Sequence, residues 1–409
     1  MLLVIAATTF NAGLAFVNAH VVALTPAAAI AVEVGLVGAA HALALANFRR
    51  EMLPWYGLIG VFALLAIARA LATGTPDVKY LRDVLIIPTF IILGFTFDPR
   101  RLTTTIVIIH AIVLAFLLFE ALDTQAYAAL LHIKEYYINT RGYEAADFWN
   151  TTSDLFVSAT RPDERFFSFI HLHRLSSIFL EPVSLGDYCI IVTAYVCACY
   201  KQLNVPTRIF LVGGVILAIL GCDGRLAATS AVLVVVGAML APFLPRRSAI
   251  LYLPGAVLAA FLLVHLAGFR GGPNNFSGRL AHTVDLLQQY GIGEFLGVSN
   301  QYLTTAVDSG LAYLITTQSL LGVVILWCFI VYASAEGSQE QIKFTHGICI
   351  YLVLTMMVSF SFLTIKTAAI LWFAQGVLQV ARRPSLVPAL RPARASASVG
   401  RPELPIFGN

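Results

Sequence analysis

Residues 102–122 read LTTTIVIIHAIVLAFLLFEAL, an apolar run that directly follows Arg100 and Arg101. A helix of about 20 apolar residues crosses the roughly 30 Å hydrocarbon core of a bilayer. Because no water reaches that core, a spanning segment has to satisfy its own backbone hydrogen bonds, which a helix does. The stretch therefore predicts a transmembrane helix.

The same pattern repeats along the chain, whose 409 residues are 59% hydrophobic and only 12% charged. Soluble domains carry about 25% charged residues, so this composition excludes an ordinary soluble protein. We expect an all-α polytopic membrane protein with about twelve spans. They lie near residues 2–19, 22–46, 53–72, 84–97, 102–122, 185–200, 208–222, 226–244, 249–268, 309–334, 344–362 and 366–381. The runs 84–97 and 208–222 are short enough to be re-entrant segments instead.

Basic residues follow every even-numbered span, and cytoplasmic loops are enriched in Lys and Arg. They are Arg49, Arg50, Arg100, Arg101, Lys201, Arg208, Arg246, Arg247, Lys343, Arg382 and Arg383. This pattern predicts a bacterial inner-membrane protein with both termini in the cytoplasm. The transmembrane domain covers 1–381, and the tail 382–409, rich in Pro, Ala, Ser and Arg, is expected to be disordered.

Two long segments, about 123–184 and 269–308, would then be periplasmic loops. Both exceed the usual connection between helices, and loops of this size commonly carry function. The chain shows no basic block typical of nucleic-acid binding, and its six cysteines form no CxxC pair. His171 and His173 lack a third ligand at suitable spacing, so we expect no metal site.

Four short clusters on the periplasmic side carry the candidate site residues, and each also has an ordinary structural explanation. Arg174 precedes Glu181 and Pro182, a pair typical of a helix start. Arg225 ends a tight Cys-Asp-Gly-Arg turn, where arginines often serve as interfacial anchors. Asp308 stands before a span, where it would cap the helix.

The remaining cluster, Ser277-Gly278-Arg279, opens a stretch that continues to about Tyr290. Its apolar residues recur at helical spacing and leave polar residues on another face. The apolar residues are Leu280, Val284 and Leu287, and the polar ones are His282, Asp285 and Gln289. The pattern predicts an amphipathic helix that lies on the membrane or over a pocket.

Together the clusters place Arg174, Arg225 and Arg279 on one membrane face. A guanidinium stays charged and binds phosphate oxygens through its planar fork. Several arginines at headgroup level therefore suit a pyrophosphate-linked lipid. A carboxylate beside them, Glu181 or Asp308, would accept a proton from an attacking sugar hydroxyl.

At these clusters the sequence resembles the Wzy-type bacterial polysaccharide polymerases, within the O-antigen ligase and polymerase superfamily. The matching motifs keep the family's order and its side of the membrane, and the resemblance covers roughly residues 100–381. The motifs are Arg174 followed by Glu181-Pro182, Gly224-Arg225, Ser277-Gly278-Arg279, and Asp308-Ser309-Gly310 followed by Gly322. Each motif is short, so the specificity lies in the ordered set.

The resemblance implies an inverting-type glycosyltransferase that polymerises undecaprenyl-pyrophosphate-linked repeat units into exopolysaccharide, capsule or O-antigen. Arg174, Arg225 and Arg279 would hold the pyrophosphate, and Glu181 or Asp308 would be the base. His282 and Tyr313 would contact the glycan. No cofactor is required, and the expected partners are the lipid-linked glycan, membrane lipid and a chain-length regulator, without nucleic acid.

Two other functions stay open. An O-antigen ligase would share the fold, but ligases carry a His-Asn or similar His pair near the last loop, where this chain has Asp308-Ser309. A non-enzymatic transporter or flippase of lipid-linked sugars should line its spans with charge. The aromatic residues of the first loop fit a glycan-handling surface better, although aromatics are also ordinary interfacial anchors. They are Tyr136, Tyr137, Tyr143, Phe148 and Trp149.

Overall fold

The computed structural model describes the chain except residues 151, 162–164, 273–274, 334–337 and 381–409. It is 78% helical, and the described residues contain no strand. The tail from residue 382, for which the sequence predicts disorder, lies outside the described residues. The main helices are α1 (Leu2–His20), α2 (Pro26–Ala46), α3 (Leu53–Thr73), α4 (Val78–Phe95), α5 (Leu102–Leu122), α6 (Thr124–Leu131), α7 (Ile133–Arg141), α8 (Pro182–Cys199), α9 (Val205–Cys222), α10 (Arg225–Leu240), α11 (Tyr252–His265), α12 (Phe276–Gln289), α13 (Ile292–Phe295), α14 (Gly310–Tyr332), α15 (Gln339–Met356) and α16 (Ile365–Val380).

Within the described part of the chain, nine helices are long and apolar enough to cross a membrane. They correspond to α1, α2, α3, α5, α8, α9, α10, α11 and α14. The spans expected at 84–97, 344–362 and 366–381 are also helical, as α4, α15 and α16, but lie outside this set. Helix α16 is shorter, and α4 carries Lys79, Arg82 and Asp83 in its first turns. The fold is thus that of an all-helical, multi-pass membrane protein.

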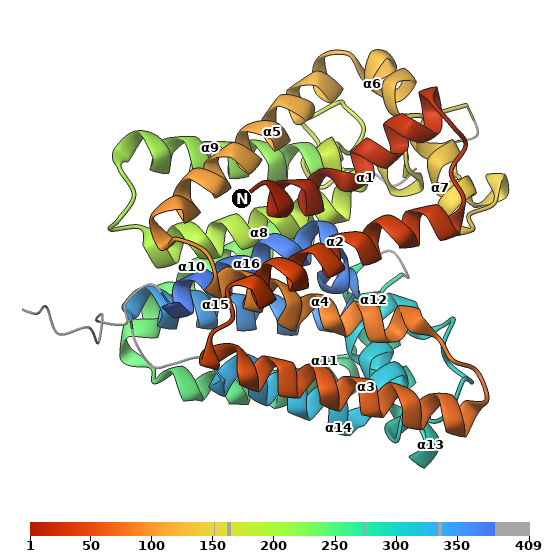
Figure 1. Ribbon diagram of the computed structural model, residues 1–409. Helices are drawn as coiled ribbons and strands as arrows, with labels where there is room; N and C mark the ends of the chain where they lie inside the picture. Colours follow the sequence, from red (N-terminus) through yellow and green to blue (C-terminus); the bar gives the residue numbers. More distant parts are fainter. Residues whose placement is uncertain (151, 162–164, 273–274, 334–337, 381–409) are drawn as a thin grey trace, which may run out of the picture.

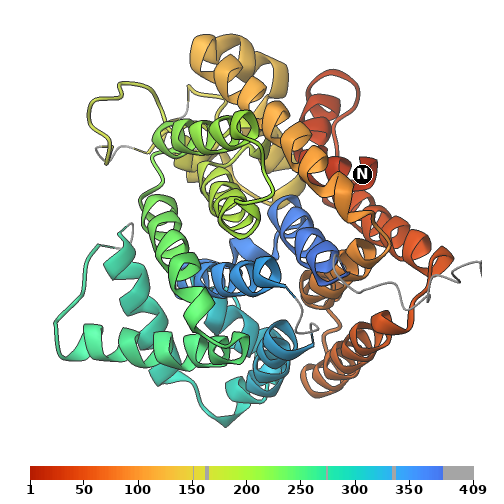
Figure 2. The same ribbon diagram turned by 90° about the vertical axis from the view of Figure 1, so that its left-hand side faces the viewer.

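Helix α16 forms the centre of the bundle, and every residue from Ile365 to Gln379 is buried. It packs most closely on α4, where Gly94 and Gly376 let the two backbones approach. Small residues commonly allow this close approach between membrane helices. Figure 2 shows α15 and α16 (blue) surrounded by the other helices.

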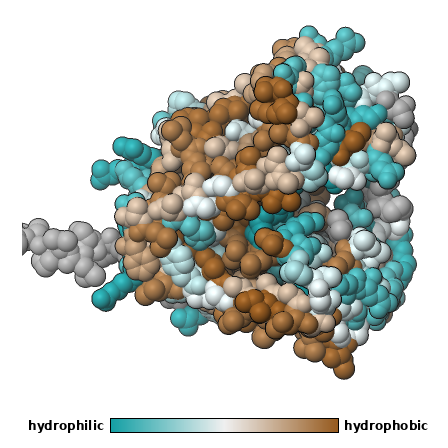
Figure 3. All heavy atoms as spheres, turned by 45° about the vertical axis from the view of Figure 1, so that its right-hand side comes forward, coloured by the Kyte–Doolittle hydropathy of each residue, from teal (hydrophilic) through white to brown (hydrophobic). Residues whose placement is uncertain are grey.

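The two long segments gather at one end of the bundle. In Figure 1, α6 and α7 of the first and α12 and α13 of the second lie at the right-hand end. The connections after α2, α4, α8 and α10 lie at the opposite end. They hold Arg49, Arg50, Arg100, Arg101, Lys201, Arg246 and Arg247. In Figure 3, hydrophobic side chains cover much of the surface, and hydrophilic ones gather toward the end that holds the two segments.

Both long segments contain helices. The amphipathic helix expected at 276–290 is confirmed as α12, which buries Leu280 and Val284 and keeps Gln289 exposed. The end of the first segment is held by α5, where the buried carboxylate of Glu120 accepts hydrogen bonds from the backbone N–H groups of Ser176 and Ser177 at 2.8 and 2.7 Å. This contact fixes the chain just before α8, where two of the candidate site residues lie.

Candidate functional site

The three arginines predicted from the sequence line one pocket, which we call the arginine pocket. Its cavity has a volume of about 170 Å³ and lies between the two long segments and the ends of α8 and α10. Arg161 lines it as a fourth guanidinium, and Asp187 and Asp223 are its two carboxylates. Four cations against two anions leave an excess of positive charge, which suits a ligand carrying more than one negative charge.

Arg174 reaches the pocket from the chain before α8. Its Nε donates to the carbonyl oxygen of Cys222 at 3.1 Å, and its Nη1 donates to that of Ser158 at 3.3 Å. Burial lowers the pKa of Arg174, yet a guanidinium has no accessible neutral form in proteins. The side chain is therefore a fixed cation, held by backbone oxygens on either side of the pocket.

Arg225 begins α10, immediately after the turn from α9. Asp223 has a positive φ of 53°, and its carboxylate accepts hydrogen bonds from the backbone N–H groups of Phe166 and Phe167 at 3.0 and 2.9 Å. The guanidinium carbon of Arg225 lies 5.8 Å from the centre of the Phe166 ring. The turn thus positions Arg225 and also holds part of the first long segment.

Arg279 comes from α12 of the second long segment. Its Nη1 lies 3.3 Å from the carbonyl oxygen of Val358 and 4.0 Å from Oδ1 of Asp308. The side chain of Asp308 is 68% exposed, and the residue that caps α14 is Ser309, whose hydroxyl accepts from the N–H of Ala312. Asp308 therefore lies beside one pocket arginine and is not the helix cap.

Asp187, which the sequence did not single out, lines the arginine pocket from the second turn of α8. The residue is only 2% exposed, its Oδ2 is fully enclosed, and the hydroxyl groups of Tyr351 and Ser361 lie beside its carboxyl group. The other pocket carboxylate, Asp223, uses both oxygens for backbone N–H groups. Asp187 is thus a buried carboxyl group in the wall of the arginine pocket.

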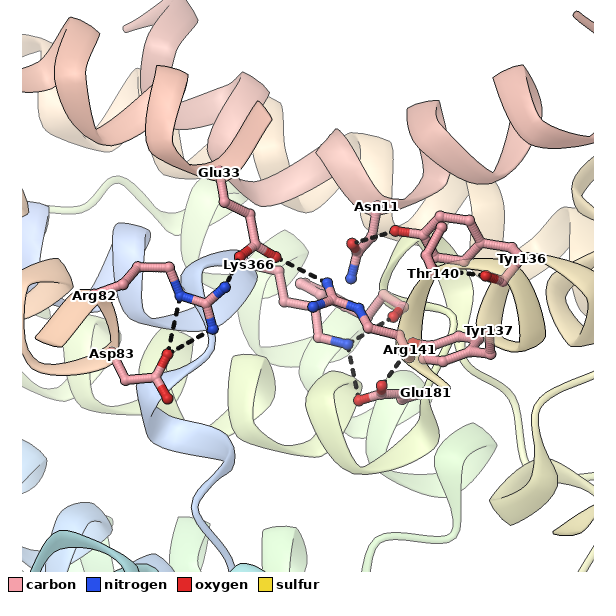
Figure 4. A network of polar contacts seen from close by, with 11 residues as sticks. Asn11, Glu33, Arg82, Asp83, Tyr136, Tyr137, Thr140, Arg141, Glu181 and Lys366 are labelled. Atoms are coloured by element: carbon pink, nitrogen blue, oxygen red, sulfur yellow. Dashed lines mark hydrogen bonds and ion pairs between the residues drawn. The ribbon is translucent and has the colours of Figure 1, made fainter. Parts of the chain in front are cut away.

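Glu181 lines a neighbouring cavity of about 210 Å³, which we call the ion-pair pocket. Its carboxylate pairs with Lys366 at 2.8 Å and accepts a hydrogen bond from Tyr137 at 2.6 Å (Figure 4). It also accepts a hydrogen bond from Ser184 at 2.9 Å. Burial alone would raise the pKa of Glu181, but Lys366 and the two hydroxyl donors lower it below its ordinary value. Pro182, the next residue, lines the arginine pocket, so the walls of the two cavities contain neighbouring residues of the chain.

The rest of the ion-pair pocket is a second chain of charges. Figure 4 shows Glu33 between Arg82 and Arg141, with Asp83 on the other side of Arg82. Glu33 lies 2.8 Å from Arg141 and also pairs with Arg82, which lies 2.7 Å from Asp83. Burial opposes the charge of Arg141, but Glu33 raises its pKa above the ordinary value. With Lys79 and Lys366, four cations line this pocket against three carboxylates, so its charges nearly balance.

The two expected glycan contacts lie apart from the arginine pocket. Nε2 of His282 is 2.9 Å from the carbonyl oxygen of Thr305. Tyr313 is buried, donates to Oδ2 of Asp83 at 2.7 Å, and stacks on Phe360, a residue that lines the ion-pair pocket. Tyr313 therefore supports the wall of that pocket, and His282 joins α12 to the end of the second long segment.

The described residues hold no group of three or more His, Cys, Asp or Glu side chains arranged to bind a metal. Nε2 of His173 contacts Glu120 at 3.0 Å, so this histidine belongs to the contact that fixes the chain before α8. No family model matches the chain, and neither a curated protein nor a solved structure is significantly similar to it.

Proposed function

We propose that the chain is a membrane glycosyltransferase that polymerises glycan repeat units linked to a lipid pyrophosphate, as its resemblance to the Wzy-type polymerases implies. The observation that carries the proposal is the convergence of Arg161, Arg174, Arg225 and Arg279 on one pocket. They come from separate parts of the chain. A pyrophosphate leaving group develops negative charge as the glycosidic bond breaks, and fixed guanidiniums stabilise that charge.

The sidedness of the site belongs to the same proposal. We place both long segments and the arginine pocket on the periplasmic side of a bacterial inner membrane, with about twelve spans and cytoplasmic termini. Basic residues at the opposite end of the bundle support this orientation. The donor sugar is already attached to a good leaving group, the lipid pyrophosphate. The proposed reaction therefore needs no nucleotide in the periplasm.

The acceptor sugar fits the ion-pair pocket. Paired carboxylates and guanidiniums offer hydrogen-bond acceptors and donors without a large net charge, which suits a neutral, hydroxyl-rich ligand. Tyr137, Tyr143 and Phe360 add aromatic surface to its lining. Because the walls of the two cavities contain the neighbouring residues Glu181 and Pro182, we place the acceptor hydroxyl there, on the side nearest the donor in the arginine pocket.

Three carboxylates are candidates for the base. Asp308 is mostly exposed, and Glu181 has both oxygens engaged by Lys366, Tyr137 and Ser184. Asp187 is buried in the wall of the arginine pocket, with the hydroxyl groups of Tyr351 and Ser361 beside it. Of the three carboxylates it is the one that lines the pocket proposed for the donor, so we favour Asp187 as the base. Glu181 would then have a structural role and hold Lys366, Tyr137 and Ser184 in place beside the two pockets.

The intermediates left by a gene deletion distinguish the three functions considered. Loss of a polymerase leaves single repeat units exposed to the periplasm, and this is the result we expect. Long polymer still attached to the lipid carrier would instead show a ligase. Single units confined to the cytoplasmic side would show a flippase and would remove the enzyme proposal. Complementation with the wild-type chain should restore polymer and serves as the control.

A further inference from the structure

An apolar groove lies between α9 and α10, and its cavity of about 480 Å³ is larger than either polar pocket. The two helices are joined by a tight turn, yet each packs along α8 and they scarcely contact each other. Helix α8 therefore forms the floor of the groove through Thr193, Val196 and Cys197. Small and β-branched residues such as Ala228, Ala231 and Val232 line its α10 side.

The groove continues the arginine pocket along the same helices. On α10, Arg225, Leu226 and Ala227 line the pocket, and Ala228 directly after them lines the groove. On α8, Gly186 lines the pocket and Thr193, two helical turns further, lines the groove. A ligand in the pocket would thus find an apolar channel leading from it toward the interior of the membrane.

The carboxylate of Asp223 contributes to both the arginine pocket and the apolar groove. Asp223 lines the arginine pocket and holds the backbone N–H groups of Phe166 and Phe167. The ring of Phe166 lies under Arg225, while the side chain of Phe167 lines the groove. The rings of Phe166 and Phe167 are in edge-to-face contact, with centroids 4.9 Å apart. The start of the groove is therefore built from the same contacts that position a pocket arginine.

We infer that the apolar groove binds the polyprenyl chain of the lipid pyrophosphate whose headgroup occupies the arginine pocket. This inference rests on the proposed function for the identity of the headgroup. A phospholipid brings two acyl chains and a single phosphate. A polyprenyl pyrophosphate brings one chain and two phosphates, which matches one groove leading from a pocket with four guanidiniums.

Two neighbouring residues of α9 provide a matched test. Ile216 lines the groove and is 55% exposed, while Leu217 is 44% exposed and does not line it. Ile216→Trp and Leu217→Trp add the same volume to the same helix. Binding of undecaprenyl pyrophosphate and of geranyl pyrophosphate, neither carrying a sugar, is measured for the wild type and for both variants reconstituted in lipid nanodiscs.

The wild type should bind the long-chain pyrophosphate more tightly, because packing of the chain in the groove adds van der Waals contacts that the bilayer does not match. Ile216→Trp should weaken that binding about tenfold and leave geranyl pyrophosphate within about twofold. Leu217→Trp should change neither. Equal binding of both ligands by the wild type, or an equal loss in the two variants, would refute the groove. This assay involves no sugar transfer, so its result is separate from that of the deletion experiment.

Discussion

Replacing Arg279 by lysine keeps a positive charge at the arginine pocket but removes the planar guanidinium fork. Nη1 of Arg279 is already held near the carbonyl oxygen of Val358 and the carboxylate of Asp308. The remaining nitrogens, Nε and Nη2, are then the donors available to phosphate oxygens. A lysine ammonium cannot occupy both positions at once, so the variant should lose a contact to the leaving group.

The expected loss follows from the energy of one charge-assisted hydrogen bond, about 1.5–3 kcal/mol. That energy corresponds to roughly a tenfold to hundredfold decrease in kcat/KM. The assay is extension of a lipid-linked repeat unit by the purified protein, with the amount of inserted protein measured in parallel. Arg279→Ala should lose activity to a similar or slightly greater extent.

Arg270→Lys is the matched control. Arg270 also makes a two-point carboxylate contact, to Asp285 at 3.0 Å for each nitrogen, but it is half-exposed and does not line the arginine pocket. This variant should keep kcat/KM within about twofold, because exposed ion pairs contribute little. If Arg279→Lys retains wild-type activity, or loses no more than Arg270→Lys, the arginine acts only as a charge anchor.

Further tests address the base, the ion pair and the orientation. Asp187→Asn keeps the side-chain shape and should lower kcat by about 10²–10⁴ with little change in KM, whereas a folded variant with kcat within about twofold of the wild type would contradict a role as base. Glu181→Gln should make the melting temperature depend less on pH under acidic conditions. The lowered pKa of Glu181 makes its stabilisation complete above the unfolded value of about 4.3, and that stabilisation is lost as pH falls through the lower, folded pKa. If the difference in melting temperature between this variant and the wild type stays the same as the pH falls, the Glu181–Lys366 pair is not the source of the pH dependence. Alkaline phosphatase fused at Asn150 should be active and at Arg247 inactive, and the reverse would overturn the orientation.

The helices could be predicted from the sequence because length and apolar composition decide which segments favour the hydrocarbon core. The first residues of a helix were harder to predict where charged side chains form ion pairs within the protein. The run expected at 84–97 begins earlier, at Val78, because the Asp77 side chain caps α4 and its Arg82 pairs with Glu33 of another helix. A hydropathy pattern counts these charges as unfavourable, since it contains no information about their partners.

The candidate site shows the same limit. The predicted side of the membrane was enough to expect Arg174, Arg225 and Arg279 near one another. The three residues do line one pocket. Nothing in the sequence indicates that Lys366 pairs with Glu181, because a lysine at a helix end also fits simple snorkelling. Asp187 was missed since a carboxylate near the start of an apolar helix resembles a capping residue until its burial is known.

The arrangement of the cavities bears on how two membrane-linked substrates would meet. The apolar groove leaves the arginine pocket between α9 and α10, whereas the ion-pair pocket is lined by residues of α1, α2 and α4, among them Asn11, Glu33 and Arg82. Helices α8 and α16, which pack on each other, contribute Pro182 to the first pocket and Lys366 to the second. We propose that donor and acceptor lipids approach from these different sides, because both remain anchored in the bilayer. In the proposed reaction each transfer leaves the lengthened chain on the acceptor lipid, so that lipid would have to leave the ion-pair pocket before it could enter the groove as the next donor.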